Sequence, residues 1–429
     1  MPIYKKTTFF VLLFTLLSST TIYANANYTV VNNCIIQNRK FPVTISTDGI
    51  DNALSTVNIL GLINDKYSLS NSIIGRIIAG YPSFYIALLN HEVVGHGRRA
   101  YEFGGTVDGY TLRLFSAATH YNLSANSHPQ QHNAITLAGV QVNACLASRI
   151  INQLLQTKQP LSPVTAWSYI FSAGNQFWYV LHDVIFEQTH DDEGTGDVKS
   201  HILNMEKIYG KTSIQDKIRS LCFLDLMNPM LFASFYTIAS GQNIQVPMIP
   251  LGQINGLGQI GFMPSVNLIL TPYNVLEKRI TVHINTEYTP IKIAFGFGQE
   301  LKSNDPVYHT LLDDSVCDSS NSWYFIKKDS TPSKVHNTYY FELSVARFFS
   351  ISKVDLGGSL IIWRQPELIT PVPRHAEIKN GIMGLLNLTF NIDDRFSIFA
   401  EAGYKTKGFI LDRPVDEGPL INFAIQCLV

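Results

Sequence analysis

Two histidines and a glutamate lie close together in one apolar segment of the chain. His91 and Glu92 are adjacent, and His96 follows five residues after His91. Neutral imidazole nitrogens bind Zn²⁺, and a neighbouring glutamate takes a proton from a polarised water. Chance placement inside a buried helix is disfavoured, because each buried polar group without a partner costs about 1–3 kcal/mol. We therefore expect His91 and His96 to bind zinc and Glu92 to be the catalytic base of a hydrolase.

The spacing of the two histidines constrains the helix that carries them. In the common HExxH arrangement the histidines are four residues apart and lie about 40° apart around a regular helix, whereas a spacing of five places them about 140° apart. One metal ion cannot bind both imidazoles in that geometry. A local widening of the helix, a π-bulge, restores a common face. Gly95 is the residue most able to accommodate it, so we predict a bulged helix at Gly95.

The string His-Glu-Val-Val-Gly-His at His91–His96 resembles the HExxGH signature of the dipeptidyl-peptidase III family of zinc peptidases, of gluzincin type. The resemblance implies a zincin-like helical domain in which His91 and His96 bind zinc and Glu92 is the general base. It covers only this string. That family takes its third ligand from a Glu-Glu-containing motif on a later helix, and no such pair stands at the comparable distance here.

A third metal ligand is expected on a later helix. In gluzincin-like enzymes a Gly-x-x-x-Glu or Gly-Gly-x-Glu pattern on the next major helix supplies it, and the best positional match here is Gln141. A glutamine offers a carbonyl oxygen but no charge, so both zinc affinity and water activation are expected to be weaker. Glu187 and His190 are the alternatives, although their acidic run is also typical of a solvated helix end.

The region from about residue 48 to residue 241 has helical periodicity. Asp48 is placed as a helix cap, and Pro82 as a first-turn residue that opens a helix over residues 84–101. A short alternating run at 110–121 predicts an edge strand or a hairpin. Further helices are expected at about 132–156, 164–188, 197–209 and 213–239.

After a connector rich in Gly, Pro, Asn and Gln, the pattern changes to an alternation of apolar and polar residues. Eight segments show it, each with one apolar face and one face of charged, small or hydroxyl residues. They cover approximately residues 260–271, 280–287, 291–298, 339–346, 355–362, 382–392, 396–405 and 421–429.

This alternation fits either a soluble β-domain with its apolar face inside or a membrane barrel with its apolar face outside. Strand length, an even strand number and the regular exchange of short turns with long polar loops favour the barrel. An eight-stranded barrel is filled by side chains, so this one is expected to anchor rather than conduct. Its interior would hold a charge network of Glu287, Lys292, Glu342, Glu401 and Lys405.

The chain begins like an exported protein. Lys5 and Lys6 precede an apolar stretch, and Ala24-Asn25-Ala26 suits signal cleavage after Ala26. Later in the chain no continuous apolar run of about 20 residues stands out, so helical membrane spans are not expected. The formal net charge of −1 and the lack of a basic stripe exclude an electrostatic case for nucleic acid. Five scattered cysteines without a CxxC pair give no basis for assigning disulfides.

The sequence thus predicts an α+β protein: an all-helical zincin-like domain followed by an antiparallel β-barrel of about eight strands. The expected divisions are a signal peptide at 1–26, a helical metallohydrolase-like domain at 27–245, a linker at 246–258 and the barrel at 259–429. The expected function is zinc-dependent hydrolysis of a peptide or protein substrate. The barrel would sit in lipid of the outer membrane of a Gram-negative bacterium, with the helical domain in the periplasm. The alternatives are an inactive metal-binding protein and a purely structural or adhesive outer-membrane protein.

Overall fold

The computed structural model describes most of the chain after residue 41. The signal peptide predicted at 1–26, the candidate ligands Glu187 and His190, and Glu287 of the predicted charge network all lie outside the described residues. The described ranges are 42–46, 48–123, 129–185, 196–209, 213–254, 258–286, 288–301, 307–310, 325–328, 336–367, 378–393 and 396–428.

Helices form the first half of the described chain, as predicted, and one is longer than expected. The Asp48 side chain accepts a hydrogen bond from the Ile50 backbone N–H and caps the first helix, as predicted. Pro82 lies inside a helix that already begins at Ile73, so it does not open that helix. The α-helices are α2 (Gly49–Tyr67), α3 (Ile73–Leu89), α4 (Arg98–Glu102), α5 (Pro129–Thr157), α6 (Pro163–Ala173), α7 (Asn175–Tyr179), α8 (Asp197–Tyr209), α9 (Ile214–Leu221) and α10 (Pro229–Ser240).

Four short segments have other helical hydrogen bonding: the π-helices η2 (Asn90–Gly97) and η3 (Val180–Ile185), and the 3₁₀-helices η1 (Leu69–Asn71) and η4 (Cys222–Leu226). The alternating run at 110–121 forms a hairpin, one of the two predicted alternatives. Its strands are β2 (Thr106–Leu112) and β3 (Ala117–Asn122). Because β2 and β3 interrupt the helices, the first half of the chain is not purely helical.

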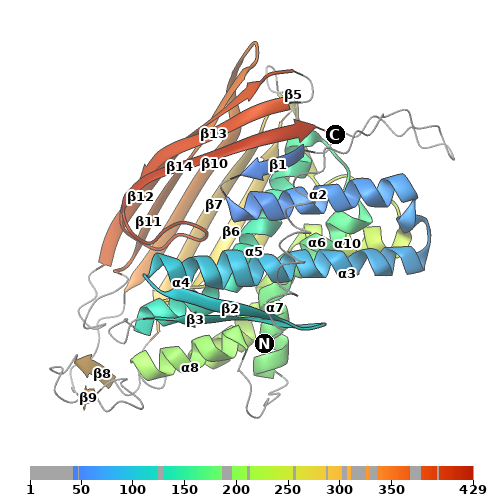
Figure 1. Ribbon diagram of the computed structural model, residues 1–429. Helices are drawn as coiled ribbons and strands as arrows, with labels where there is room; N and C mark the ends of the chain where they lie inside the picture. The colour runs from blue at the N-terminus through green and yellow to red at the C-terminus, as the bar shows by residue number, and fades with distance from the viewer. Residues whose placement is uncertain are drawn as a thin grey trace.

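Among the described residues the main sheet has ten antiparallel strands in the order β1-β14-β13-β12-β11-β10-β7-β6-β5-β4 (Figure 1). Eight of them are the eight segments predicted from alternation. A second pair, β8 (Val307–Thr310) and β9 (Phe325–Lys328), lies in a long loop. The strands of the main sheet are β1 (Pro42–Ser46), β4 (Ile249–Ile254), β5 (Gly258–Leu270), β6 (Val275–Asn285), β7 (Pro290–Glu300), β10 (Asn337–Ile351), β11 (Val354–Pro366), β12 (Ile378–Asn391), β13 (Phe396–Lys405) and β14 (Gly418–Leu428).

The sheet turns its apolar face outward and its polar face inward. Leu386, opposite Ala402 in the β12–β13 pair, is 65% exposed, whereas Lys405 on the other face is fully buried. Of the predicted charge network, Lys292 and Glu342 form an ion pair of 3.0 Å. Exposed apolar side chains recur along successive strands: Ile280, Phe295, Phe297, Tyr339, Leu360, Ile362, Ile382, Leu386, Leu388, Phe390, Ile398, Tyr404, Ile421, Phe423 and Ile425.

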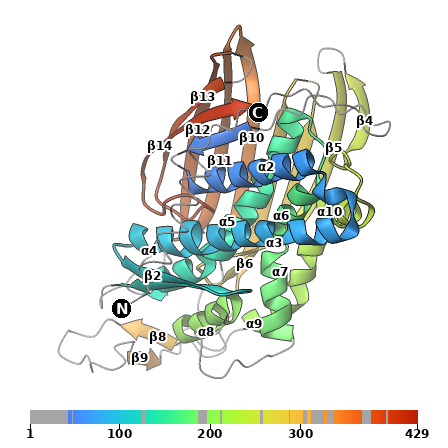
Figure 2. The same cartoon turned by 45° about the vertical axis from the view of Figure 1, so that its right-hand side comes forward.

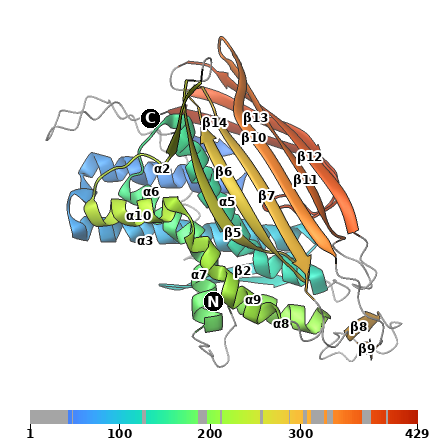
Figure 3. The ribbon, with the colours of Figure 1, turned by 180° about the vertical axis from the view of Figure 1, so that it is seen from behind.

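The sheet is open, so the predicted closed barrel is wrong. Its edges in the described chain are β1 and β4, and helices occupy its concave side (Figures 2 and 3). Helix α5 runs along that side, and Leu137 of α5 shares a core with Leu268 and Leu270 of β5. A barrel prediction assumes that the first and last strands pair with each other, and alternation within each strand contains no information about that pairing.

The two halves of the chain are also joined through their strands. The connector predicted at 246–258 contains β4, and β1, which precedes the helices, pairs with β14. The long polar loop predicted at 405–418 to be an outer loop instead reaches the helical region, because its Asp412 pairs with Arg98 at 3.3 Å just after η2. The sheet and the helical region therefore hold the segment of the His-Glu-His motif between them.

Two helical stretches have the length and composition of membrane spans, contrary to the sequence-based expectation. They are Ile73–Glu102, which combines α3, η2 and α4, and Gln130–Thr157 of α5. Only 33% of the apolar window in the first stretch is buried, compared with 72% in the second. Shorter apolar runs separated by Arg76 or by amides hide these stretches from a search for uninterrupted apolar residues.

Candidate metal centre

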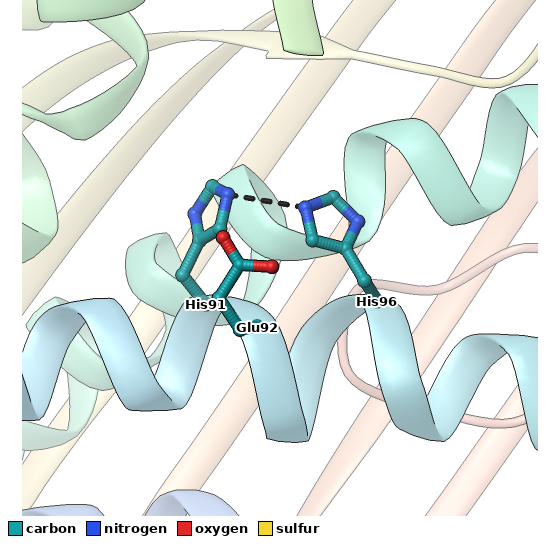
Figure 4. Close-up of side chains that lie close together, drawn as sticks. All are labelled: His91, Glu92 and His96. Carbon is teal, nitrogen blue, oxygen red and sulfur yellow. Dashed lines mark hydrogen bonds between the residues drawn. The ribbon is translucent and has the colours of Figure 1, made fainter. Parts of the chain in front are cut away.

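The motif lies on the π-helix η2 (Asn90–Gly97), which confirms the predicted widening of the helix. The wider turn brings the rings of His91 and His96 onto one face (Figure 4). Gly95 has a second role, because a Cβ atom there would lie 2.6 Å from the Cα atom of Gly139 on α5. A side chain at Gly95 would therefore separate the two helices, so this glycine permits their close approach.

The two imidazoles face each other edge to edge. Their Nε2 atoms are 3.1 Å apart, and both residues are buried. The Nδ1–H of His91 donates to Asn175 Oδ1 at 3.2 Å, and the Nδ1–H of His96 donates to the carbonyl oxygen of Ile135 at 2.7 Å. A neutral ring that carries its proton on Nδ1 has a lone pair on Nε2. The two lone pairs therefore point at each other and need a cation or a proton between them.

Asp197, the first residue of α8, completes this arrangement. Its Oδ2 atom is 2.8 Å from His91 Nε2 and 3.2 Å from His96 Nε2. This oxygen is buried, and apart from the two imidazoles no described residue hydrogen bonds to it. The structure thus brings two nitrogens and one carboxylate oxygen to a common point.

The charge of Asp197 is held by its surroundings. Burial alone would raise the pKa of this carboxyl, but positive charge on the imidazoles of His96 and His91, together with their hydrogen bonds, outweighs burial and holds the pKa well below its usual value. The pKa of the nearby Tyr121 is raised, mainly by burial and to a smaller extent by the negative charge of Asp197. Asp197 is therefore an ionised carboxylate at neutral pH, which is the form that binds metal ions.

The three atoms fit a Zn²⁺ ion. Zinc binds nitrogen and carboxylate oxygen at about 2.0–2.2 Å in tetrahedral geometry, which separates neighbouring ligands by about 3.3 Å. The observed separations are 2.8, 3.1 and 3.2 Å. The hydrogen bonds from the two Nδ1 atoms also match the outer contacts that orient metal-binding histidines. The donor set, its spacing and its outer contacts therefore all suit zinc.

Glu92 lies beside these ligands and is held by the β2–β3 hairpin. One possible ligand atom from each of His91, Glu92 and His96 lies within 4.8 Å of the others. The hydroxyl of Thr119 on β3 donates to Glu92 Oε2 at 2.7 Å. The hairpin approaches closely, because a Cβ atom on Gly97 would lie 2.4 Å from the hydroxyl oxygen of Tyr110 on β2. Glu92 thus has a fixed orientation next to the ligand atoms.

A tyrosine lies against the outer side of the first imidazole. The ring of Tyr179 is stacked on that of His91 with a centroid distance of 5.7 Å, and its hydroxyl is 3.5 Å from His91 Nε2. Tyr179 ends α7 and directly precedes the second π-helix, η3. The centre therefore has a phenol hydroxyl near the ligand atoms in addition to the Glu92 carboxylate.

The structure does not bring Gln141 to the histidines. Its Nε2 atom donates to the carbonyl oxygen of Leu270 at 3.2 Å, and the side chain lines a cavity of about 530 Å³ between α5 and the sheet. The residue of α5 that faces His91 is Gly139, where a Cβ atom would lie 2.4 Å from His91 Nε2. Two residues advance a helix by about 200°, so Gln141 lies on the opposite side of α5.

Sequence reasoning did not single out Asp197 as a candidate ligand. The residue stands at the start of the helix predicted at 197–209, where a carboxylate is ordinarily explained by the positive end of the helix dipole. A usable signal was present in its surroundings, because Asp197 and His201 stand four residues apart and share one helix face. His201 is fully buried, and its Nδ1–H donates to Asn133 of α5 at 2.9 Å, which fixes α8 against α5.

A comparison of the whole chain with known protein families, with curated proteins and with solved structures finds no match.

Proposed function

We propose that this protein is a zinc-dependent hydrolase that cleaves peptide bonds, with His91, His96 and Asp197 as metal ligands. The observation that carries the proposal is the convergence of three lone-pair atoms, with separations of 2.8, 3.1 and 3.2 Å. Such a cluster is repulsive unless a proton or a metal cation occupies it. Asp197 supplies the negative charge that Gln141 lacks, so zinc affinity and water activation are not weakened by the absence of a glutamate at position 141.

Zn²⁺ supplies a Lewis acid that polarises a carbonyl group and acidifies water. Glu92 is placed to accept the proton of the attacking water and to deliver it to the leaving amine, because its Oε2 atom is held at 2.7 Å by the Thr119 hydroxyl. The Tyr179 hydroxyl is placed to donate to the developing oxyanion, since it lies 3.5 Å from His91 Nε2. The burial of Glu92 keeps bulk water away from this proton transfer.

The outer face of the sheet supports a membrane location for this enzyme. A contiguous apolar surface of this extent is disfavoured in water, and soluble proteins rarely expose one larger than a few hundred Å². Along β12 the outward positions are all uncharged, and Leu386 is 65% exposed. Lys292 of β7 and Glu342 of β10 face inward and form an ion pair. We therefore place the sheet in a bilayer, with the outer membrane as the proposed site.

The metal assignment is tested by elemental analysis of the purified protein in detergent. Wild type should contain one zinc per chain, and His91→Ala and Asp197→Ala should lose it, because each removes one of three ligands. Gln141→Ala is the matched control and should keep its zinc, since Gln141 lies on the opposite side of α5. Zinc that persists in both ligand variants, or that disappears only in Gln141→Ala, contradicts the proposed ligand set.

The catalytic assignment needs a separate measurement. Glu92→Gln should retain zinc, because Glu92 is not a ligand in the proposed set, and should lose turnover of a mixed peptide library by about 10²–10⁴-fold, as general base removal does. Thr119→Val tests the positioning of Glu92 and should reduce turnover less. Wild-type protein that binds stoichiometric zinc but cleaves no member of the library would identify a metal-binding protein without hydrolase activity.

A further inference from the structure

Two helices outside the sheet expose stripes of large apolar side chains. On α3, Ile73 and Ile77 are each 61% exposed, and with Ile74, Ile78 and Tyr81 they follow helical spacing along one face. On α10, Phe232 is 66% exposed and lies on one face with Phe235 and Tyr236. The opposite faces of both helices are buried, so each helix is apolar all round.

Charged groups are nearly absent from these two helices. Helix α10 contains no charged residue, and α3 contains only Arg76. Arg76 does not extend from the exposed stripe, because its guanidinium lies against Gly241 at the end of α10. The outward surface of α3 and α10 therefore resembles the outward face of β12 in having bulky apolar side chains without charge.

The two helices lie in the gap between the edges of the open sheet. Contacts run from β5 to α10, from α10 to α3, from α3 to α2 and from α2 to β1, which pairs with β14 (Figure 2). The ten strands and these three helices thus form a continuous ring around the polar interior. In that ring, the sheet covers one side and the helices cover the other.

An open sheet in a bilayer would expose its buried ion pairs to lipid. Charged and polar groups of that interior would cost several kcal/mol each if they met hydrocarbon, so the ring around them must be complete. We propose that the exposed faces of α3 and α10 contact the acyl chains of the bilayer and close the lipid-facing perimeter that the ten strands leave open. This inference rests on the proposed membrane location of the sheet and adds the helices to it.

The test places an environment-sensitive fluorescent amino acid at one position at a time by codon suppression, which leaves the native cysteines intact. The protein is reconstituted into vesicles of phosphatidylcholine with brominated or unbrominated acyl chains, because bromine quenches only probes that contact lipid. Ile77 and Phe235 are the test positions. Leu386 on the sheet is the membrane reference, and Lys217, which is exposed on α9, is the aqueous control.

Probes at Ile77, Phe235 and Leu386 should lose most of their fluorescence in brominated vesicles, whereas a probe at Lys217 should respond only to iodide added to the buffer. Quenching by lipid at Leu386, with quenching by iodide at Ile77 and Phe235, overturns the inference and leaves the membrane location standing. Quenching by iodide at Leu386 overturns the membrane location itself. If the probe at Ile77 is protected from both quenchers and this protection disappears on dilution, a second copy of the chain covers the exposed face of α3. That result also overturns the inference.

A second measurement uses the unmodified wild-type chain and so does not depend on variants that fold. Vesicles that contain phosphatidylcholine with a photoreactive acyl chain are irradiated, and the modified residues are mapped by mass spectrometry. Adducts should occur in α3 and α10 as well as on the outward residues of the sheet. Adducts confined to the strands would show that the helical side of the ring does not meet lipid.

Discussion

Two regions of this protein bury charged or strongly polar groups, and the two regions balance the charges of these groups in different ways. Inside the sheet, opposite charges lie side by side, as Lys292 and Glu342 do at 3.0 Å. At the candidate metal centre, three lone-pair atoms converge within 3.2 Å, and the Tyr179 hydroxyl lies 3.5 Å from one of them. These charges of the sheet interior are therefore balanced within the protein itself, whereas the metal centre needs a proton or a metal cation to balance it.

This difference separates stability from function. A buried ion pair offsets much of its own desolvation cost, but it becomes strongly unfavourable when one partner is removed. A cluster of converging lone pairs costs stability until a metal ion binds, and the binding free energy then contributes to the stability of the loaded protein. Substitutions in the sheet interior should thus change folding at any zinc concentration, and substitutions at the metal centre should change zinc affinity first.

The largest expected effect comes from removing the partner of a buried charge inside the sheet. Glu342→Ala leaves Lys292 buried without its partner and should lower the free energy of unfolding by about 3–5 kcal/mol, with or without zinc. The measurement is denaturant unfolding of the protein in detergent. The double variant Lys292→Met with Glu342→Leu is the matched control and should recover most of the loss. An equal loss in the single and double variants would contradict the paired-charge interpretation of this interior.

The opposite face of the same sheet gives the next effect. Leu386→Arg puts a charge in the middle of the outward surface and should reduce folding stability in phosphatidylcholine vesicles by about 2–4 kcal/mol. Asn380→Arg is the control, because it lies on the same face of β12 near the end of the strand and should cost at most about 1 kcal/mol. Two equally small costs would indicate that this face meets water.

A glycine next to the metal centre gives a smaller effect on folding. Gly139→Ala places a Cβ atom 2.4 Å from His91 Nε2, so the ring must move. We expect a loss of about 1–3 kcal/mol in unfolding free energy and a weaker affinity for zinc. Gly384→Ala, where nothing lies within 4 Å of the added Cβ, should change neither quantity. Normal zinc affinity in Gly139→Ala would contradict the position of His91.

Local patterns predicted the strands and the bulge well, because both depend on nearby residues. Alternation with a period of two identified all eight strands of the main sheet that follow β4. It did not identify the small separate pair β8–β9. The spacing of five between His91 and His96 required a wider helix turn, and η2 has one. In both cases the geometry follows from the repeat of a single element.

The features that the sequence did not reveal depend on contacts between distant segments. Asp197 meets His91 only because α8 crosses α5, and an aspartate at a helix start has an ordinary local explanation. The position of Gln141 on the next major helix predicts a ligand, but its direction around α5 carries it away from the metal centre. The open sheet escaped prediction for the same reason, since the β1–β14 pairing joins residues at opposite ends of the described chain.

The smallest expected effect separates the outer contacts of the metal centre from its ligands. Asn175→Ala removes the acceptor of the His91 Nδ1–H hydrogen bond, now 3.2 Å long, and should weaken zinc binding by about 10–100-fold, as loss of such outer contacts does. Asn175→Asp retains an acceptor and should restore the affinity, as measured by competition with a chelator. The free energy of unfolding of the zinc-free protein should change little, because Asn175 is only half-buried and alanine is well tolerated in a helix. Loss of stability without loss of affinity would mean that Asn175 supports the fold rather than the orientation of His91, and the comparison between the two buried regions would then fail at this residue.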